Sequence, residues 1–379
     1  MISIKKERVL ISPKDIKPSS KDLEVIGTIN PGAVRLSNGD ILLYIRVIEK
    51  LIKDEDNKYY YSPRMVGENK FKLKLDKFDK NLVETKSNLD FIFKDNTKRL
   101  TFISHLRRVL LDKTGFKVKS IDKKPSFFGL SWDSELGVED PRVTKIGDSY
   151  LMTYVSLSRD ENVSTSYALS NDCFRWYRRD VIFREENKDV VIFPEKVKRE
   201  YVALNRPEGS FAFTLPHIWV SHSKDLEHWG ESKSLILSEK DWDSGRVGAG
   251  APPIKTEKGW LLLYHGVVEG KKLEKMFFKS NLKAEFEYFE KRVYYCVGAA
   301  LLDLENPRKV IAKSKFPIIF PTKEYERGSF ENKNVIFPTG IIIDANGKDL
   351  LIFSGGGDVV TSVKKVSFKE VLDAMEKVQ

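Results

Sequence analysis

Five segments of this sequence begin with polar residues beside a proline and continue into an apolar run. The chemically capable side chains at three of these starts are Asn30, Glu139, Asp140, Arg142, Glu195 and Lys196. Carboxyl groups can transfer protons, and cations and amides can hold anionic or polar ligands. Polar groups buried without partners cost on the order of several kcal/mol, so these must meet a ligand or one another. For Asp140 and Arg142 the residue types leave both interpretations open.

Other catalytic and cofactor motifs are missing from the sequence. Gly245, Gly248 and Gly250 are not preceded by a strand and followed by a helix, and no Lys-Ser or Lys-Thr closes the series. The series is therefore neither a dinucleotide-binding nor a P-loop motif. There is no His-Glu-x-x-His sequence and no cluster of cysteines and histidines with metal-ligand spacing. We expect no metal and no cofactor.

A repeated element positions the polar starts. Each copy reads as strand, tight turn, strand, and contains one of the prolines Pro31, Pro141, Pro194, Pro253 and Pro338. Asn38-Gly39 and Asn346-Gly347 are typical of type I′ hairpin turns. Successive prolines are 110, 53, 59 and 85 residues apart, and one four-stranded propeller blade takes about 50 residues. The pattern predicts an all-β fold, a five-bladed β-propeller with the polar starts around one pocket. Two stacked β-sandwiches are the alternative.

Two shorter patterns add turns and a helix. Residues 170–176 and 223–229 share a Ser-x-Asp-x-x-x-Trp spacing, which predicts structural turns whose Ser or Asp bonds the local backbone. Apolar residues at helical spacing from 368 to 378, after Ser367 as N-cap, predict a short C-terminal helix within 365–379.

The domain organisation follows from these elements. We expect a single catalytic domain over 1–379, with the blades between 25 and 360. Residues 50–60 are charged and are predicted to form an insertion loop, and 273–291 a hairpin or lid between blades.

Composition narrows the class of protein. The 379 residues carry 65 Lys and Arg against 55 Asp and Glu, a formal net charge of +10, and only two cysteines. Two cysteines cannot form a disulfide framework. The N-terminus lacks the apolar core of a signal peptide, and no stretch reaches the roughly 18 apolar residues of a membrane span. We therefore expect a cytoplasmic protein without a membrane partner. The charge alone would allow nucleic acid, but no basic segment with interleaved aromatics supports it.

Seven short motifs occur in one order along the chain. They are Asn-Pro-Gly-Ala-Val at 30–34, Val-Glu-Asp-Pro-Arg at 138–142, Asp-Val-Val-Ile-Phe-Pro-Glu-Lys at 189–196, Asn-Arg-Pro at 205–207, Trp-Asp-Ser-Gly-Arg-Val-Gly-Ala-Gly at 242–250, Tyr-His-Gly at 264–266 and Phe-Ser-Gly-Gly-Gly-Asp at 353–358. With them the sequence resembles glycoside hydrolase family 130, whose better-known members are inverting phosphorylases of β-mannosides. The family fold is a five-bladed β-propeller, in agreement with the repeat.

The resemblance implies a general acid. Asp140 matches the residue that protonates the glycosidic oxygen, a transfer that the phosphorylases relay through a sugar hydroxyl. An acid of this kind needs a raised pKa, which burial or the neighbouring Glu139 would supply and Arg142 would oppose.

The resemblance also implies a phosphate site. Arg206, Arg246 and His265 match phosphate-binding positions, with Lys188 as a fourth. Guanidinium groups suit a dianion. In inverting phosphorolysis phosphate itself attacks, so one catalytic carboxyl is enough, whereas a hydrolase needs a second one to activate water. The residues implied at the sugar, with Glu195 either a pocket carboxylate or a partner of Lys196, are Asn30, Arg46, Glu139, Glu195, Lys196 and Asp358.

Some features depart from the common family pattern. The interval between Asn30 and Asp140 is long and contains His105, Arg107 and Arg108, which either reach the pocket or belong to an exposed strand. Arg246 stands where Lys is frequent. These departures bear on the acceptor sugar and the linkage.

The sequence thus predicts an inverting glycoside phosphorylase, a glycosyltransferase-type enzyme that converts a β-mannoside or related β-linked oligosaccharide and inorganic phosphate to α-mannose 1-phosphate. The expected partners are the oligosaccharide and phosphate, without nucleic acid, and a homo-oligomer is left open. The alternatives are a glycoside hydrolase on the same fold and a non-catalytic carbohydrate-binding propeller.

Overall fold

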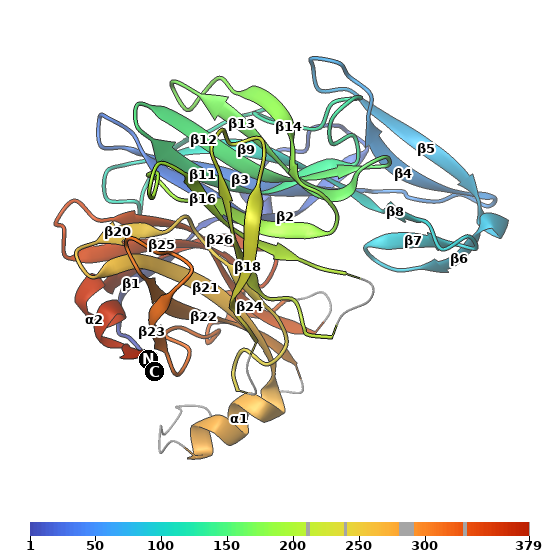
Figure 1. The fold of residues 1–379 in the computed structure, drawn as a ribbon. Helices are drawn as coiled ribbons and strands as arrows, with labels where there is room; N and C mark the ends of the chain where they lie inside the picture. Colours follow the sequence, from blue (N-terminus) through green and yellow to red (C-terminus); the bar gives the residue numbers. More distant parts are fainter. Residues whose placement is uncertain (210–212, 239–240, 280–291, 329–331, 379) are drawn as a thin grey trace.

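The computed structural model describes residues 1–209, 213–238, 241–279, 292–328 and 332–378, and it confirms the predicted all-β class. Within these residues, three four-stranded antiparallel sheets follow one another along the chain (Figure 1). The first contains β2 (Leu23–Arg35), β3 (Ile41–Leu51), β9 (Phe102–Leu111) and β10 (Val118–Ile121). The second contains β11 (Gly137–Ile146), β12 (Ser149–Ser158), β13 (Asn162–Ser170) and β14 (Tyr177–Phe183). The third contains β15 (Asn187–Ile192), β16 (Tyr201–Pro207), β17 (Ile218–Ser223) and β18 (Gly230–Ile236).

The remaining large sheet joins two strand groups. One group is β19 (Val247–Ala249), β20 (Ile254–Thr256), β21 (Gly259–Glu269), β22 (Val293–Leu302) and β23 (Val310–Ser314), with β27 (Met375–Lys377) at its edge. The other is β24 (Lys333–Ile343), β25 (Asp349–Gly356), β26 (Val360–Ser367) and β1 (Ile4–Ile11). A parallel pairing of β22 with β24 connects the groups. Because β1 pairs with β26, the N-terminal strand completes a group made from the C-terminal part of the chain.

The elements outside these sheets are small. A lobe between β3 and β9 contains β4 (Tyr59–Met65), β5 (Leu73–Asp79), β6 (Val83–Lys86), β7 (Asp90–Phe93) and β8 (Lys98–Leu100), and it projects from the body in Figure 1. The helices are α1 (Gly270–Lys279) and α2 (Phe368–Asp373), with 3₁₀ turns at Pro13–Asp15, Lys80–Leu82 and Glu324–Glu326. The predicted insertion loop at 50–60 is therefore the start of a lobe with five strands of its own among the described residues.

A β-bulge in the first strand of each four-stranded sheet sets the direction of a polar side chain. In β2, β11 and β15, two residues oppose one residue of the partner strand, and the first of the two is Asn30, Asp140 or Asp189. These three residues have φ of 49°, 49° and 54°. Among residues with a side chain, Asn and Asp tolerate this left-handed region best. A bulge changes the direction of the side chain that it carries. The three sheets therefore have the same bulge, beginning with an Asn or Asp, at equivalent positions.

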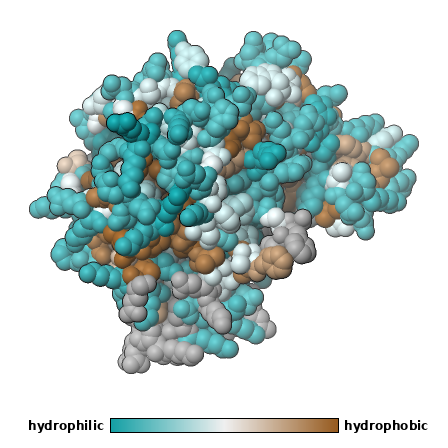
Figure 2. Space-filling model, in the orientation of Figure 1, coloured by the Kyte–Doolittle hydropathy of each residue, from teal (hydrophilic) through white to brown (hydrophobic). Residues whose placement is uncertain are grey.

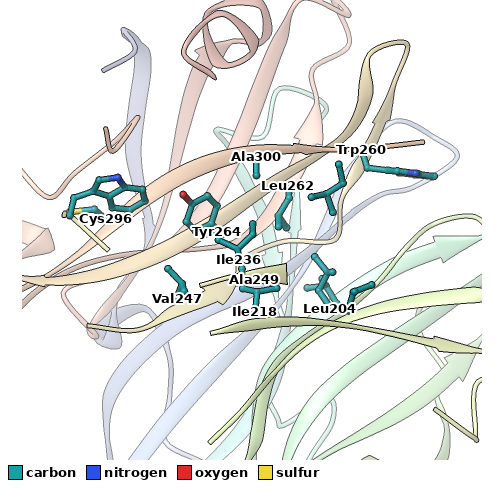
Figure 3. Packing of buried hydrophobic residues seen from close by; sticks show 14 of the residues in the cluster. Leu204, Ile218, Ile236, Val247, Ala249, Trp260, Leu262, Tyr264, Cys296 and Ala300 are labelled. Carbon is teal, nitrogen blue, oxygen red and sulfur yellow. The ribbon is translucent and has the colours of Figure 1, made fainter. Parts of the chain in front are cut away.

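Apolar clusters fill the space between successive sheets. One cluster joins the third sheet to β19–β22, where Figure 3 shows Ile218 next to Ala249. Similar clusters join the first sheet to the second, the second to the third, β21–β22 to β24–β26, and the β1 group back to the first sheet. A Cβ on Gly32 would lie 2.8 Å from the carbonyl oxygen of Pro141, so the glycine of Asn-Pro-Gly lets β2 approach β11. The clusters therefore join each sheet or strand group to the next in a closed order, in which the last group packs against the first sheet.

The predicted turns are confirmed in part. Asp172 and Asp225 each accept two backbone N–H bonds in the Ser-x-Asp-x-x-x-Trp segments, as expected. The prediction of type I′ hairpins is wrong. Gly39 and Gly347 have positive φ, but the asparagine before each does not. Each turn is instead closed by a hydrogen bond from the glycine N–H to the carbonyl three residues earlier. The turn is then type I, with the glycine in the left-handed region after it.

Three other expectations need correction. The repeat copy assigned to Pro194 is out of register, because β15 ends at Ile192 and its bulge lies at Asp189. The C-terminal helix begins after Ser367, which caps it as predicted, but it ends at Asp373 because 375–377 pairs with β23 instead. Within the segment expected as a hairpin or lid, 273–279 belongs to α1, and 280–291 lies outside the described residues.

The surface is mainly hydrophilic on the face seen in Figure 2, with hydrophobic residues in small areas between polar ones. No helix in the described ranges is long and apolar enough to cross a membrane.

Candidate functional site

Asn30 and Asp140 meet where the bulges of β2 and β11 face each other. Nδ2 of Asn30 donates a hydrogen bond to Oδ1 of Asp140 at 2.8 Å, and Nη1 of Arg46 on β3 donates to the same oxygen at 3.2 Å. Arg46 also pairs with Glu139, which accepts a bond from Ser104. The Asp140 side chain is 13% exposed. Both donors act on Oδ1, and Oδ2 forms no hydrogen bond or ion pair with a described residue, so it can bind a substrate.

Asp189 occupies the corresponding bulge of β15 and binds two arginines. Its Oδ1 lies 3.4 Å from Nη2 of Arg142, and its Oδ2 lies 2.7 Å from Nη1 of Arg206. Arg142 donates to the carbonyl oxygens of Asp140 and Gly250, both at 2.7 Å. Arg142 therefore does not pair with the Asp140 carboxylate. It connects the backbone at Asp140 to the carboxylate of Asp189.

The basic cluster, defined as Lys188, Arg206, Arg246 and His265, lies around Asp189 and continues outward. Nε2 of His265 accepts a bond from Nη1 of Arg206 at 3.2 Å, and the His265 ring lies 4.5 Å from that of Phe337. Lys188 lies opposite Arg206 in the register of β15 and β16. Its ammonium group forms no ion pair or hydrogen bond with the described residues.

One carboxylate bridges the outer part of the cluster. Oε1 of Glu208 lies 2.6 Å from Nη2 of Arg206 and 3.5 Å from Nη1 of Arg246. The side chains become more exposed along this line, from 0% at His265 and 6% at Arg206 to 21% at Glu208 and 43% at Arg246. Arg246 is thus the member of the chain of contacts that solvent reaches first.

The charge state of Asp140 follows from its neighbours, a point that the sequence left open. Burial raises the pKa of its carboxyl, but Arg46, Arg142, the hydrogen bond from Asn30 and Lys188 together hold the pKa below its usual value. The raised pKa that a general acid needs is therefore not present in the ligand-free protein, because nearby positive charges favour the ionised carboxylate. In this state Asp140 is ionised at neutral pH.

His265 is neutral at physiological pH. Burial, followed by Arg206 and Arg142, holds the pKa of its imidazole well below the usual value. Arginine cannot accept a hydrogen bond, so Nε2 is the acceptor and the proton lies on Nδ1. A neutral histidine adds no charge to the basic cluster and can still bind a ligand through hydrogen bonds.

Asp358 joins the site from the turn between β25 and β26. It has φ of 57° after Gly357, and its charge raises the pKa of Arg46 along with the nearer Glu139 and Asp140. Asn30 is also close to this hairpin, because a Cβ on Gly355 would lie 2.3 Å from its Oδ1. The structure thus brings Asn30, Arg46, Glu139 and Asp358 together beside Asp140, and their binding to a sugar stays a prediction.

Glu195 and Lys196 lie elsewhere, which corrects their assignment to the pocket. Glu195 is 51% exposed and pairs with Lys255 at 2.5 Å, and Lys196 lies over the ring of Tyr201. Lys255 is opposite Trp260, five residues from His265 along β21, or about 17 Å at the usual rise of a strand. Both residues follow β15, so they lie beyond the bulge that carries Asp189.

The three basic residues of β9 also do not reach Asp140. His105 and Arg107 are buried beside Glu49, at 3.4 and 3.7 Å, and Arg108 pairs with Asp122. Ser104 enters the site, where it donates a hydrogen bond to Glu139. His105 and Arg107 point to the opposite face of the strand, and Arg108, on the face of Ser104, lies four residues further along.

The site contains three residues that are not among those predicted from the sequence: Asp189, Glu208 and Ser104. Asp189 opens one of the seven motifs and Glu208 directly follows another, so the motifs are a signal for both. Ser104 has no local signal. No group of three or more His, Cys, Asp or Glu in the described part of the chain could hold a metal ion.

This chain is similar to known proteins along most of its length. Residues 93–377 match the model of glycoside hydrolase family 130, described as beta-1,4-mannooligosaccharide phosphorylase. The chain is 34% identical to a beta-1,2-mannobiose phosphorylase of Listeria innocua over 381 aligned positions, which cover 98% of this chain and 97% of that protein. It is 32% identical to a 1,2-beta-oligomannan phosphorylase of Thermoanaerobacter sp. over 264 positions, 69% of this chain and 78% of the relative. The solved structure of the Listeria innocua beta-1,2-mannobiose phosphorylase with beta-1,2-mannobiose aligns with a TM-score of 0.80 at 33% identity, over 96% of both chains.

Proposed function

Because this chain belongs to glycoside hydrolase family 130, we propose that it is an inverting β-mannoside phosphorylase. The supporting observation is that Arg142 links Asp140 to Asp189 and so places a proton-transferring carboxyl beside the basic cluster. A similarity along nearly the whole chain to a beta-1,2-mannobiose phosphorylase favours β-1,2-mannobiose as the substrate. The products are α-mannose 1-phosphate and the released sugar.

The reaction needs few protein groups. A phosphate oxygen attacks the anomeric carbon, the glycosidic C–O bond breaks on the opposite face, and the leaving oxygen takes a proton from Asp140. Asp140 is ionised without ligand, so it must gain this proton as substrates bind. Bound phosphate adds negative charge beside the carboxylate, and a nearby like charge raises the pKa of an acid. Asn30, Arg46, Glu139 and Asp358 supply hydrogen bonds to the sugar.

We also propose a five-bladed β-propeller as the architecture. The support is three four-stranded sheets, two strand groups within the large sheet, and apolar clusters that join all five in cyclic order. Pairing of β1 with β26 closes such a ring at the chain ends. Phosphate as co-substrate without a further cofactor, a cytoplasmic location, one domain over the whole chain and a homo-oligomer stay predictions.

A phosphate-dependence assay tests the function. The protein is incubated with β-1,2-mannobiose, with and without inorganic phosphate, and products are identified by phosphorus and proton NMR. We expect α-mannose 1-phosphate with phosphate present and no measurable cleavage without it, with β-1,4-mannobiose as the comparison substrate. Free mannose released equally in both samples would identify a hydrolase. Binding without turnover would favour a carbohydrate-binding protein.

Replacement of Arg246 tests whether the basic cluster binds phosphate. Arg246→Ala removes the most exposed guanidinium of the basic cluster, and an ionic hydrogen bond to phosphate contributes about 1.5–3 kcal/mol. We expect the KM for phosphate to rise by roughly 10- to 100-fold, while the KM for the disaccharide changes less than about twofold. Initial rates over a grid of both substrates measure this.

The matched control is Arg308→Ala, which removes an arginine paired with Glu231 on the surface. An Arg246→Ala enzyme with an unaltered phosphate KM would rule out the proposed role of this residue.

A further inference from the structure

Glu208 lies where an anion would bind the two arginines of the basic cluster. A single oxygen, Oε1, is within 2.6 Å of Arg206 and 3.5 Å of Arg246, on the solvent side of the cluster. Arg206 already has a buried partner in Asp189 at 2.7 Å, so Glu208 is not needed to neutralise it. A carboxylate oxygen and a phosphate oxygen make the same charge-assisted bonds to guanidinium groups.

We propose that the Glu208 carboxylate competes with phosphate for Arg206 and Arg246 and so sets the affinity of the site for phosphate, an inference that rests on the proposed phosphorylase function. Phosphate cannot bind both guanidinium groups on this side while the Glu208 carboxylate stays between them. The backbone of Glu208 is fixed by a hydrogen bond from its N–H to the carbonyl of Glu186 at 2.7 Å. The exchange therefore needs only rotation of a side chain that is partly exposed.

The consequence is a lowered apparent affinity for phosphate. When a ligand binds only the fraction of molecules with an open site, its apparent Kd is the intrinsic Kd divided by that fraction. A resident carboxylate also keeps the two arginines from binding other anions tightly. Phosphate and mannose 1-phosphate share this site in the two directions of a reversible reaction, so Glu208 would weaken both.

The test uses Glu208→Gln in the full-length protein. The amide keeps the shape and one acceptor for Arg206 but removes the charge. We expect the Kd of inorganic phosphate, measured by titration calorimetry, and the phosphate KM both to fall by about five- to tenfold. The KM for mannose 1-phosphate in the synthetic direction should fall as well, and that for the disaccharide should not change. Glu208→Ala should shift the phosphate values in the same direction.

The control is Glu231→Gln, which neutralises a carboxylate paired with Arg308 at the surface and should leave phosphate binding unaltered. An unchanged or higher phosphate Kd in Glu208→Gln would overturn the proposal, because a residue that only positions Arg206 would weaken binding when altered. If the wild-type protein cleaves the disaccharide without phosphate and Glu208→Gln loses that cleavage, Glu208 is a general base that activates water, and the proposal is wrong. Calorimetry measures phosphate binding without turnover, so it tests the role of Glu208 independently of the reaction. A wild-type protein that yields no mannose 1-phosphate would refute the phosphorylase proposal in a separate experiment.

Discussion

Asp140→Asn should lower the turnover of β-1,2-mannobiose with phosphate by about 10²- to 10⁴-fold, the usual contribution of a general acid. The amide has no acidic proton, and the leaving sugar oxygen then departs unprotonated. The fold should persist, since the amide oxygen can still accept the bond from Asn30, and Arg46 keeps its pairing with Glu139. The measurements are kcat under saturating substrates and circular dichroism of the variant.

Two comparisons make this result specific. Asp122→Asn alters a carboxylate paired with Arg108, outside the site, and should keep full activity. A substrate with an activated leaving group, such as an aryl β-mannoside, needs less protonation and should recover part of the lost rate in Asp140→Asn. Full activity of Asp140→Asn on the disaccharide would exclude Asp140 as the acid.

The second large effect concerns stability. Asp189→Asn removes the buried carboxylate shared by Arg142 and Arg206, which leaves Arg142 without a carboxylate partner and Arg206 with only the partly exposed Glu208. Breaking a buried ion pair from one side costs about 3–5 kcal/mol, and the Asn oxygen can replace one hydrogen bond. We expect a loss of about 3 kcal/mol in the free energy of unfolding, measured by urea denaturation, and a higher KM for phosphate.

Glu195→Gln is the comparison, since Glu195 pairs with Lys255 at 2.5 Å and both side chains are about half exposed. A pair of this kind should cost less than about 1 kcal/mol. Equal losses for the two variants would mean that Asp189 is not a buried counter-charge for the two arginines.

Positively and negatively charged side chains alternate through the site. Arg46, Arg142 and Arg206 are each held by carboxylates in the ligand-free protein, and the carboxylates Asp140, Asp189 and Glu208 are held by arginines. On the proposed function, phosphate binds where most charged groups already have partners. Its binding would then release Glu208 from the arginines and raise the pKa of Asp140, so that one event would open the site and protonate the acid.

The residue series by itself determined the all-β class, the Ser-x-Asp turns and the cap at Ser367, and its family motifs predict roles for Asp140 and the basic cluster. These depend on local chemistry: strand periodicity, the hydrogen bonds of short polar side chains, and motifs of adjacent residues. Asn30 and Asp140 were found because proline follows each of them, which marks the bulge.

Only the tertiary structure decided which charged groups meet. Asp189 has no proline after it, so the proline pattern points to Pro194 and predicts Glu195 and Lys196 in the pocket in place of Asp189. The side chain at one strand position faces the site and the next faces away, as Ser104 and His105 do. The charge state of Asp140 depends on Arg46 from another strand of the chain. Coulomb energies depend on distances in space, and those distances are fixed by how separate sheets pack around a shared centre.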